Sequence, residues 1–385
     1  MSENNMPNNY PVILCHGLVG WGPAEVGGFP YWGFAPTVPS PLPRYIAGVG
    51  PLSSTHDRAC ELAFQIKGGT VDYGEAHAKE MGHARFGKTF DKNAAFHPNW
   101  SEANPVHLVG HSMGAPTSWM VQQLLATDYF GWGSNAKWVK SVSGISGVLN
   151  GMTSTYFFGC DEKTGLIPAN SVAAIVYAWI EFTVNITGDL FNRVYDFDLG
   201  HWGFTLQPGE TLPSLVKRIT DSPMFRGKDN AMYWLTIQAA LDQNKLCQTH
   251  PDTYYFTYVT EQTHKGFLTE CQVPTLLMNP LMIAPAYYQG SKVFNQPFYP
   301  GFKSSDWWSN DGLVSAYTQT FPRISGSHPV GGEIKATHQN FTPGKWFYQM
   351  LNDTDHLDII CMPDVLNITK QVQFYTQLFQ RLASL

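Results

Sequence analysis

A serine set between glycines is the strongest chemical signal in the chain. The segment Gly110-His-Ser-Met-Gly114 fits the pattern G-x-S-x-G, in which the serine stands on a sharp turn between a strand and a helix. A buried strand is predicted at Val106–Val109 and a helix at Ala115–Thr127, so the turn has the required flanks. The helix start then faces the negative charge that develops on a reacting carbonyl oxygen. Ser112 is therefore predicted to be the nucleophile of an acyl-transfer enzyme.

Such a nucleophile needs two backbone N–H groups to stabilise the oxyanion. One comes from the residue after the serine, and the other comes from a loop that follows an earlier strand. The sequence His16-Gly17-Leu18 follows the predicted strand Val12–Cys15, which is the required order. The predicted donors are therefore the backbone N–H groups of Leu18 and Met113. His16 is interpreted as a residue that orders this loop by hydrogen bonding.

The acid and the base are expected in the chain order Ser, Asp, His. Asp311 lies in an Asn-Asp-Gly turn, and His356 lies in a short loop beside an apolar run. Position alone leaves two alternatives open, because an Asp-Gly turn is also an ordinary turn signal and His356 could be a solvated loop residue. Asp353 and Asp355 compete for the role of the acid. The other histidines after Ser112 lie in polar or loop-like contexts: His201, His250, His264, His328 and His338.

Strands that alternate with helices predict a parallel sheet around these residues. Residues 33–50 are rich in proline and are expected to be loop, and the stretch from His356 to Cys361 is expected to be a strand end or the loop beside one. The remaining predicted elements are the strands Trp138–Ser146 and Tyr254–Val259 and the helices Asp57–Gly68, Ser171–Asn192 and Val372–Leu385.

Composition excludes several classes of function. The chain has 385 residues, with 24 Lys and Arg against 30 Asp and Glu, a net charge of −6 and no basic run, so nucleic acid is not an expected partner. No apolar run reaches the roughly 18 residues of a transmembrane helix. The residues from Met1 to Asn9 are polar and contain no signal-peptide core. Five N-x-[ST] sequences give slight support to a secreted protein supplied without its leader, and an intracellular location stays open.

Several stretches, in the same order from residue 10 to residue 360, resemble the thermoalkaliphilic lipases of Bacillus and Geobacillus and the related staphylococcal lipases. The resemblance implies an α/β-hydrolase fold, with a central, mostly parallel sheet, helices on both faces, lid helices and a zinc-bound extra region. It implies that Ser112, Asp311 and His356 form the catalytic triad. The stretches that carry it include Cys15–Gly22, Gly50–Ser54, Asp57–Glu61, Gly68–Gly74, His77–Gly87, Pro251–Tyr255, Asn310–Gly312 and Asp355–Leu357.

A metal site is also implied by the resemblance. His77 and His83 lie six residues apart, which by itself is no zinc signature. The family's structural zinc site uses two aspartates and two histidines, and the matching positions here are Asp57, His77, His83 and Asp229. Four protein ligands fill a tetrahedral zinc ion and leave no open position, so the predicted zinc is structural. His56, next to Asp57, is an alternative ligand.

The chain matches only some of the residues that bind calcium in this family. Asp358 matches one carboxylate ligand, but Pro363 stands at the position of the other and Asp364 comes one residue late. Leu277 replaces the family's glycine in a distant loop, where a backbone carbonyl can still serve. Calcium normally takes six or more oxygens, so this cofactor stays open.

The organisation and function implied are those of a single catalytic domain over residues 1–385. A lid is expected at about 157–235 and a zinc-binding region at about 50–90. The apolar helix at Ser171–Asn192 is interpreted as part of the lid, and a core helix is the alternative. The predicted function is hydrolysis of carboxylic esters, most simply of triacylglycerol at a lipid-water interface, through an acyl-enzyme. A phospholipase or lipid acyltransferase is the alternative enzyme, and a lipid-binding protein on a hydrolase scaffold is the non-enzymatic alternative.

Overall fold

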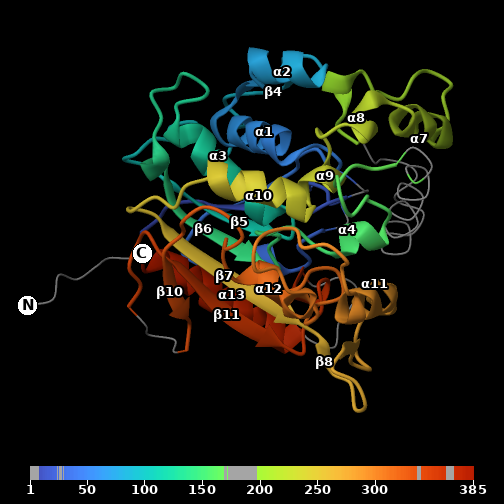
Figure 1. Cartoon of the computed structure of the whole chain (residues 1–385). Helices are drawn as coiled ribbons and strands as arrows, with labels where there is room; N and C mark the ends of the chain where they lie inside the picture. The colour runs from blue at the N-terminus through green and yellow to red at the C-terminus, as the bar shows by residue number, and fades with distance from the viewer. Residues whose placement is uncertain are drawn as a thin grey trace, which may run out of the picture.

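A central parallel sheet organises the molecule (Figure 1). The structure is a computed structural model that describes residues 8–385 except 24, 26–27, 29, 169–170, 172–196, 336–339 and 361–367. In the described part, seven strands pair in the order β10-β11-β7-β6-β5-β1-β2, and every pair is parallel. The carboxyl ends of all seven strands therefore lie at one edge. The strands are β1 (Val12–Cys15), β2 (Arg44–Ala47), β5 (Val106–His111), β6 (Val139–Ile145), β7 (Tyr254–Glu261), β10 (Val330–Glu333) and β11 (Trp346–Asn352).

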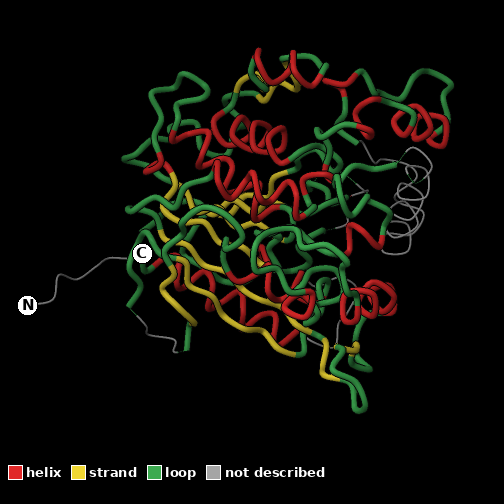
Figure 2. The backbone as a smooth tube through the Cα atoms, in the orientation of Figure 1, coloured by secondary structure: helices red, strands yellow, loops and turns green. Residues whose placement is uncertain are grey.

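Helices cover both faces of this sheet (Figures 1 and 2). The helices α1 and α3 pack on one face, and α13 packs on the other. The helices are α1 (Thr55–Lys67), α2 (Glu75–Met81), α3 (Gly114–Ala126), α4 (Ser154–Phe157), α7 (Leu212–Thr220), α8 (Pro223–Arg226), α9 (Ala231–Trp234), α10 (Ile237–Leu246), α11 (Pro280–Ser291), α12 (Ala316–Thr320) and α13 (Ile368–Ala383). Short 3-10 turns are η2 (Ala35–Thr37), η3 (Ala136–Trp138), η5 (Gly200–Trp202), η6 (Ser304–Trp307) and η7 (Asp358–Ile360).

Strand β1 shows how the sheet separates the two cores. Its side chains are all buried, and they alternate between the faces, as successive residues of a strand must. Val12 and Leu14 belong to the core that includes α13, whereas Ile13 and Cys15 belong to the core under α1 and α3. A strand buried on both sides is a continuous apolar run, which is why it was predictable from the sequence.

Two small antiparallel hairpins lie outside the central sheet. One is formed by β3 (Gly69–Asp72) and β4 (Phe86–Phe90), and the other by β8 (Thr263–Lys265) and β9 (Gln272–Pro274). Figure 1 shows the β8–β9 hairpin projecting from the body of the molecule next to α11. No helix among the described residues has both the length and the hydropathy needed to cross a membrane.

The structure corrects one of the expected elements and decides another. The segment 33–50, expected to be loop, contains β2, an edge strand whose proline-rich flanks conceal it. Of the two alternatives for the stretch from His356, the structure has the loop beside a strand end, because β11 ends at Asn352 and the chain turns into η7. The Asp355 carboxylate causes this turn by accepting hydrogen bonds from the N–H groups of Leu357 and Asp358, at 2.9 and 3.0 Å.

The other predicted elements agree with the structure or lie outside it. The predicted strands at 106–109, 138–146 and 254–259 correspond to β5, β6 and β7, and the helices at 57–68 and 115–127 correspond to α1 and α3. Helix α13 begins four residues before the predicted start at Val372. The helix expected at Ser171–Asn192 lies outside the described residues beyond Ser171, so the division into a lid and a zinc-binding region stays a prediction.

Candidate active site and metal centre

Ser112 occupies a strained turn between β5 and α3. Its φ angle is 54°, a left-handed conformation that costs a residue with a side chain about 1–3 kcal/mol. Its backbone N–H donates to the carbonyl of Ile145 at 2.9 Å, which holds the turn against the neighbouring strand. A Cβ on Gly110 would lie 2.0 Å from the carbonyl oxygen of Gly114, and a Cβ on Gly114 would lie 2.2 Å from the carbonyl oxygen of Cys15. Any larger residue at position 110 or 114 would therefore collide with the backbone, so both positions require glycine.

Two backbone N–H groups beside Ser112 are available to a ligand. In the described part of the chain, neither the Leu18 N–H nor the Met113 N–H donates to a protein acceptor. The loop that carries Leu18 lies against the serine, because a Cβ on Gly17 would be 2.8 Å from the Cβ of Ser112. Met113 is the residue that precedes the first turn of α3. This pair of donors can bind an oxyanion at the start of a helix.

His16 orders the loop beside the serine, as expected. The backbone N–H of Val49 donates to its Nε2 at 3.1 Å, so its other ring nitrogen carries the proton and donates to the carbonyl of Gly17 at 2.8 Å. Burial, reinforced by the positive charge of Arg58, lowers the pKa of His16 to about 3. The ring is therefore neutral at physiological pH and serves as a structural bridge.

Asp311 and His356 form a buried pair at the carboxyl edge of the sheet. The Nδ1 of His356 lies 2.9 Å from the Oδ2 of Asp311, and both residues are buried. Thr260 Oγ1 and Gln319 Nε2 donate to the same oxygen at 2.7 and 3.1 Å. The backbone N–H groups of Val314 and Leu313 donate to Oδ1, at 2.7 and 3.1 Å. An ionised carboxylate can accept hydrogen bonds but cannot donate them, and the groups around Asp311 are all donors.

The competing aspartates do not contact the ring of His356. The Asp355 carboxylate accepts from three backbone N–H groups, the two in its own turn and that of Asn279 at 2.8 Å, and burial raises its pKa. Asp353 is exposed. Of the three candidates for the acid, Asp311 is thus the one paired with the histidine.

His111 connects the His356 loop to the turn that carries Ser112. Its Nε2 lies 3.1 Å from the backbone carbonyl of His356, and the two rings have centroids 4.7 Å apart. The Oη of Tyr31 lies 2.7 Å from Nδ1 of His111 and accepts from the N–H of Gly17 at 2.9 Å. These bonds join both loops to the end of β5. Sequence analysis did not identify this role, because the pattern G-x-S-x-G leaves position 111 unspecified.

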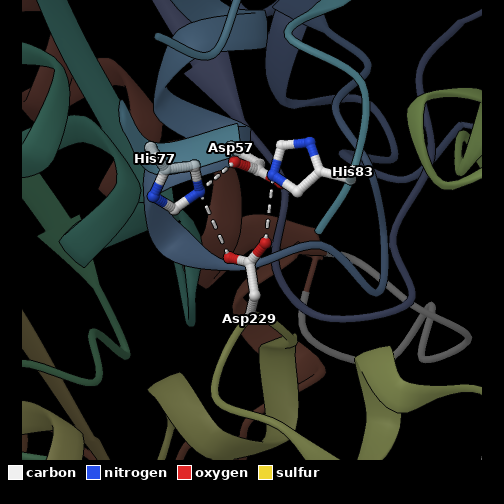
Figure 3. A group of neighbouring side chains, drawn as sticks. All are labelled: Asp57, His77, His83 and Asp229. Atoms are coloured by element: carbon white, nitrogen blue, oxygen red, sulfur yellow. Dashed lines mark hydrogen bonds and ion pairs between the residues drawn. The ribbon is translucent and has the colours of Figure 1, made fainter. Parts of the chain in front are cut away.

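A second cluster of titratable side chains lies at α1, away from the serine. Asp57 is in the first turn of α1, His77 is in α2, His83 follows α2, and Asp229 lies between α8 and α9. Figure 3 shows the four side chains pointing toward one another. Their ligand atoms all lie within 4.8 Å of one another. The structure thus brings together the four residues expected to bind zinc.

The atoms of this cluster fit a metal ion better than they fit one another. The Nε2 of His77 lies 3.0 Å from Asp57 Oδ1 and 3.5 Å from Asp229 Oδ1, and the Nε2 of His83 lies 3.3 Å from Asp229 Oδ2. Yet His83 Nε2 and both carboxylate oxygens of Asp229 are buried without a hydrogen bond among the described residues. Buried polar atoms without partners are costly. Two imidazole nitrogens and two carboxylate oxygens are a donor set that zinc accepts, so these four residues are a candidate metal site.

Outer residues position Asp57. His201 Nε2 lies 3.1 Å from Asp57 Oδ2, and His56 Nδ1 lies 3.2 Å from Oδ1. Burial would raise the pKa of Asp57, but hydrogen bonds from His201, His56 and His77 outweigh burial and hold this pKa well below its usual range. Tyr73 Oη lies 3.3 Å from His201 Nδ1. Sequence analysis placed His201 in a loop-like context and missed this role, because no local pattern joins residues 144 positions apart.

The expected calcium ligands are only partly described. Asp358 is buried, and one of its carboxylate oxygens accepts from the N–H of Asp355 at 3.0 Å. Leu277 is exposed at the surface. Pro363 and Asp364 lie outside the described residues, so this site stays an open prediction.

Comparison with known proteins identifies the family. Residues 8–384 match the family model described as "Lipase-like, C-terminal domain". The chain is 31% identical over 377 residues to Lipase 1 of Staphylococcus aureus strain MRSA252, and the match covers 93% of this chain and 52% of the relative. Two further strains of the same species give the same identity and coverage. The chain therefore spans about half the length of the curated relatives it matches.

Solved structures agree with this assignment. EstA from Clostridium botulinum matches with a TM-score of 0.84 and 32% identity, covering 100% of this chain and 89% of that one. Staphylococcus hyicus lipase matches with a TM-score of 0.75 and 27% identity, covering 100% of this chain and 98% of that one. The predicted α/β-hydrolase fold and the predicted resemblance are both confirmed. The chain belongs to the staphylococcal-type lipase family of α/β-hydrolases.

Proposed function

We propose that this chain is a carboxylic ester hydrolase that acts on water-insoluble lipid esters, with triacylglycerol as the substrate class. The observation that carries the proposal is the buried Asp311–His356 pair, with a separation of 2.9 Å, beside the strained turn of Ser112. The names of the staphylococcal relatives, Lipase 1 of Staphylococcus aureus and Staphylococcus hyicus lipase, support the same chemistry. Secretion into an extracellular medium, where such lipids occur as droplets, stays the predicted setting.

Ser112 and His356 carry the chemistry in this proposal. His356 Nε2 takes the proton from Ser112 Oγ, which attacks the ester carbonyl and forms a tetrahedral oxyanion. The carbonyl re-forms, the bond to the alkoxy oxygen breaks, and His356 returns the proton to the departing alcohol. Water then attacks the acyl-serine by the same route, and releases the carboxylic acid and free Ser112. Asp311 keeps the proton of the ring on Nδ1 and stabilises the imidazolium, without taking the proton itself.

The backbone donors lower the barrier for both steps. Leu18 and Met113 are proposed to donate their N–H groups to the oxyanion, which appears in each tetrahedral intermediate. One donor of this kind is worth about 3–4 kcal/mol in other acyl-transfer enzymes. Both groups lack a protein acceptor in the described structure, so no hydrogen bond must break before the substrate binds.

The metal site is proposed to hold a structural Zn²⁺. Asp57, His77, His83 and Asp229 would hold the ion and so tie the segments from α1 to α9 together. Four protein ligands leave no position for substrate, so the ion would supply stability and no reaction step. The sites for ester cleavage and for metal binding are therefore independent in this proposal.

The test is hydrolysis of emulsified long-chain triacylglycerol beside a soluble short-chain ester, for the intact protein and for Ser112→Ala. The expected result is that the intact protein cleaves both substrates and that Ser112→Ala lowers both rates by at least about 10⁴-fold. Cleavage of the short ester alone would restrict the substrate class to soluble esters. Unchanged rates in Ser112→Ala would rule out the serine mechanism.

A further inference from the structure

The β8–β9 hairpin holds large apolar side chains in water. Phe267 and Leu268, at its turn, are 100% and 88% exposed, and Leu276 and Leu277, just after β9, are also almost wholly exposed. We call Phe267 and Leu268 the apolar tip; Leu276 and Leu277 lie at the base of the hairpin, just beyond the pair of Thr263 with Pro274, and they lead to α11. Single exposed apolar side chains are ordinary, but several on one projection mark a contact surface. Figure 1 shows this hairpin projecting from the body of the molecule.

Helix α11 continues the apolar surface. Its inner face is fixed, because Met282 and Ala286 are buried in the core and a Cβ on Gly312 would lie only 2.5 Å from the Cβ of Met282. Its outer face presents Leu281, Ile283 and Tyr287 to solvent, where an amphipathic helix would carry polar side chains. The exposed apolar surface therefore runs from the hairpin along α11.

Hydrogen bonds tie this surface to the edge of the sheet that carries the active site. At the base of the hairpin, Thr263 Oγ1 accepts from the N–H of Asn310 at 3.0 Å. At the start of α11, the N–H of Asn279 donates to the Asp355 carboxylate at 2.8 Å. Asn310 and Asp355 directly precede the proposed acid and the proposed base. A body docked on the hairpin and α11 would thus lie beside the edge of the sheet that carries Asp311 and His356.

The charges of this surface indicate what docks there. Residues 263–291 contain one lysine and one glutamate, and these two, Lys265 and Glu270, pair with each other at 2.7 Å. An anionic bilayer requires a group of basic residues, and this segment has none beyond the paired lysine and the exposed imidazole of His264. Large apolar side chains on an electrically balanced support match the uncharged surface of an ester droplet.

We propose that the apolar tip and the outer face of α11 form an anchor that inserts into the uncharged surface of a lipid ester droplet and holds the sheet edge with Ser112 against it. This anchor consists of described residues only and is distinct from the predicted lid. It rests on the proposed function, which it deepens by naming the surface that meets the substrate phase.

The test compares the double variant Phe267→Ser/Leu268→Ser with the matched double variant Phe86→Ser/Leu246→Ser. The control also replaces one exposed phenylalanine and one exposed leucine, at β4 and at the end of α10, away from the hairpin. Partitioning onto triolein droplets is measured by flotation in a Ser112→Ala background. Burial of each of these side chains in the droplet is worth about tenfold in partitioning, so the tip variant, which loses both, is expected to bind about 100-fold more weakly. The control is expected to bind like the parent.

Activity separates failure of the anchor from failure of the proposed function. With Ser112 present, the tip variant is expected to cleave a soluble short-chain ester at the parent's rate while it loses activity on droplets. Equal droplet binding by the tip variant and the parent overturns the anchor, whatever the activity. If light scattering shows a parent dimer that the tip variant lacks, with droplet binding unchanged, the surface joins two copies of the chain and the proposal is wrong. If the parent cleaves neither ester, but the tip variant still binds droplets more weakly than the parent does, only the proposed function fails.

Salt gives a second readout of the same proposal. Raising NaCl from about 0.05 to about 0.5 M screens charge contacts and leaves apolar insertion intact. Droplet binding of the parent is therefore expected to hold or to strengthen. A marked loss of binding with salt would show that charges elsewhere dock the protein, and would overturn the anchor.

Discussion

Histidines occur both at the sheet edge beside Ser112, here called the active edge, and at the metal site, but they are fully buried only at the first, and their partners differ. At the active edge, His16 and His111 bond to backbone carbonyls, and burial lowers the pKa of each, to about 3 for His16. At the metal site, burial would lower the pKa of His77, but the carboxylates of Asp229 and Asp57 beside its ring outweigh burial and raise this pKa to about 9.

This difference in partners indicates that the two regions have different functions. At the active edge, hydrogen bonds hold the neutral rings of His16 and His111 and the carboxylate of Asp311 in fixed places. The metal site contains two buried carboxylates that face two imidazoles, and their negative charge favours positive charge between them, either as protons on the imidazoles or as a bound cation. Three predictions, from the largest expected effect to the smallest, test this contrast.

The contrast depends first on Asp311 being the acid. Replacing Asp311 by Asn would favour the wrong tautomer of His356, and is expected to lower kcat/KM on a soluble ester by about 10⁴-fold, the size of the effect in other serine hydrolases. The matched control is Asp355→Asn, which changes a neighbouring buried carboxylate that accepts from backbone N–H groups and does not contact the ring of His356. We expect the control to stay within about tenfold of the parent, since a lost cap costs stability and not chemistry. Equal losses in the two variants would remove the distinction between them.

The second prediction concerns metal affinity. His201 bonds to Asp57 from outside the cluster, and outer hydrogen bonds of this kind are worth about 10–100-fold in affinity. His201→Gln is therefore expected to weaken Zn²⁺ binding by about 10–100-fold, and Asp229→Ala to abolish stoichiometric binding. Competition with a chelator measures the affinity, and thermal unfolding with and without Zn²⁺ measures the linked stability.

The exposed His264 offers the matched control for metal binding. His264→Gln is expected to bind Zn²⁺ like the parent. If Asp229→Ala binds one Zn²⁺ as tightly as the parent, the cluster is no metal site and the contrast between the two regions is lost.

The third prediction concerns how a neutral buried histidine, His107, makes the stability of the protein depend on pH. Burial, reinforced by Lys140, lowers the pKa of His107 on β5 to about 3, against about 6.5 in an unfolded chain. Between these values the unfolded state binds one more proton than the folded state. This histidine therefore costs no stability above about pH 6.5, and it lowers the free energy of unfolding by about 1.4 kcal/mol per pH unit as the pH falls toward 3.

His107→Gln is expected to remove that contribution, so the loss of stability between pH 6 and pH 4 becomes shallower by about 1.4 kcal/mol per unit. Denaturant unfolding across this range measures the slope. His264→Gln, at an exposed position, is expected to keep the parent slope. An unchanged slope in His107→Gln would mean that the buried ring takes up a proton without unfolding.

Much of the framework could be predicted from the sequence, because the signals were local. Strands buried on both faces are continuous apolar runs, and the turn of Ser112 lies between one such strand and a helix. The contacts around the sites are different. Thr260 and Gln319 donate hydrogen bonds to Asp311 from other elements, and His201 contacts Asp57 from 144 positions away. No local sequence pattern indicates which residues contact these two aspartates. The edge strand β2 was missed because it is short and only partly buried.

The bond between His111 and the His356 loop also sets an order of events in synthesis. It joins residues 245 positions apart, so the proposed nucleophile leaves the ribosome long before its base. At about 5–20 residues per second, the interval is roughly 12–50 s. During that time the emerging chain already contains Ser112 but has nothing to activate it. A growing chain is therefore expected to lack the proposed ester-cleaving activity until β11 and the His356 loop that follows it have been made.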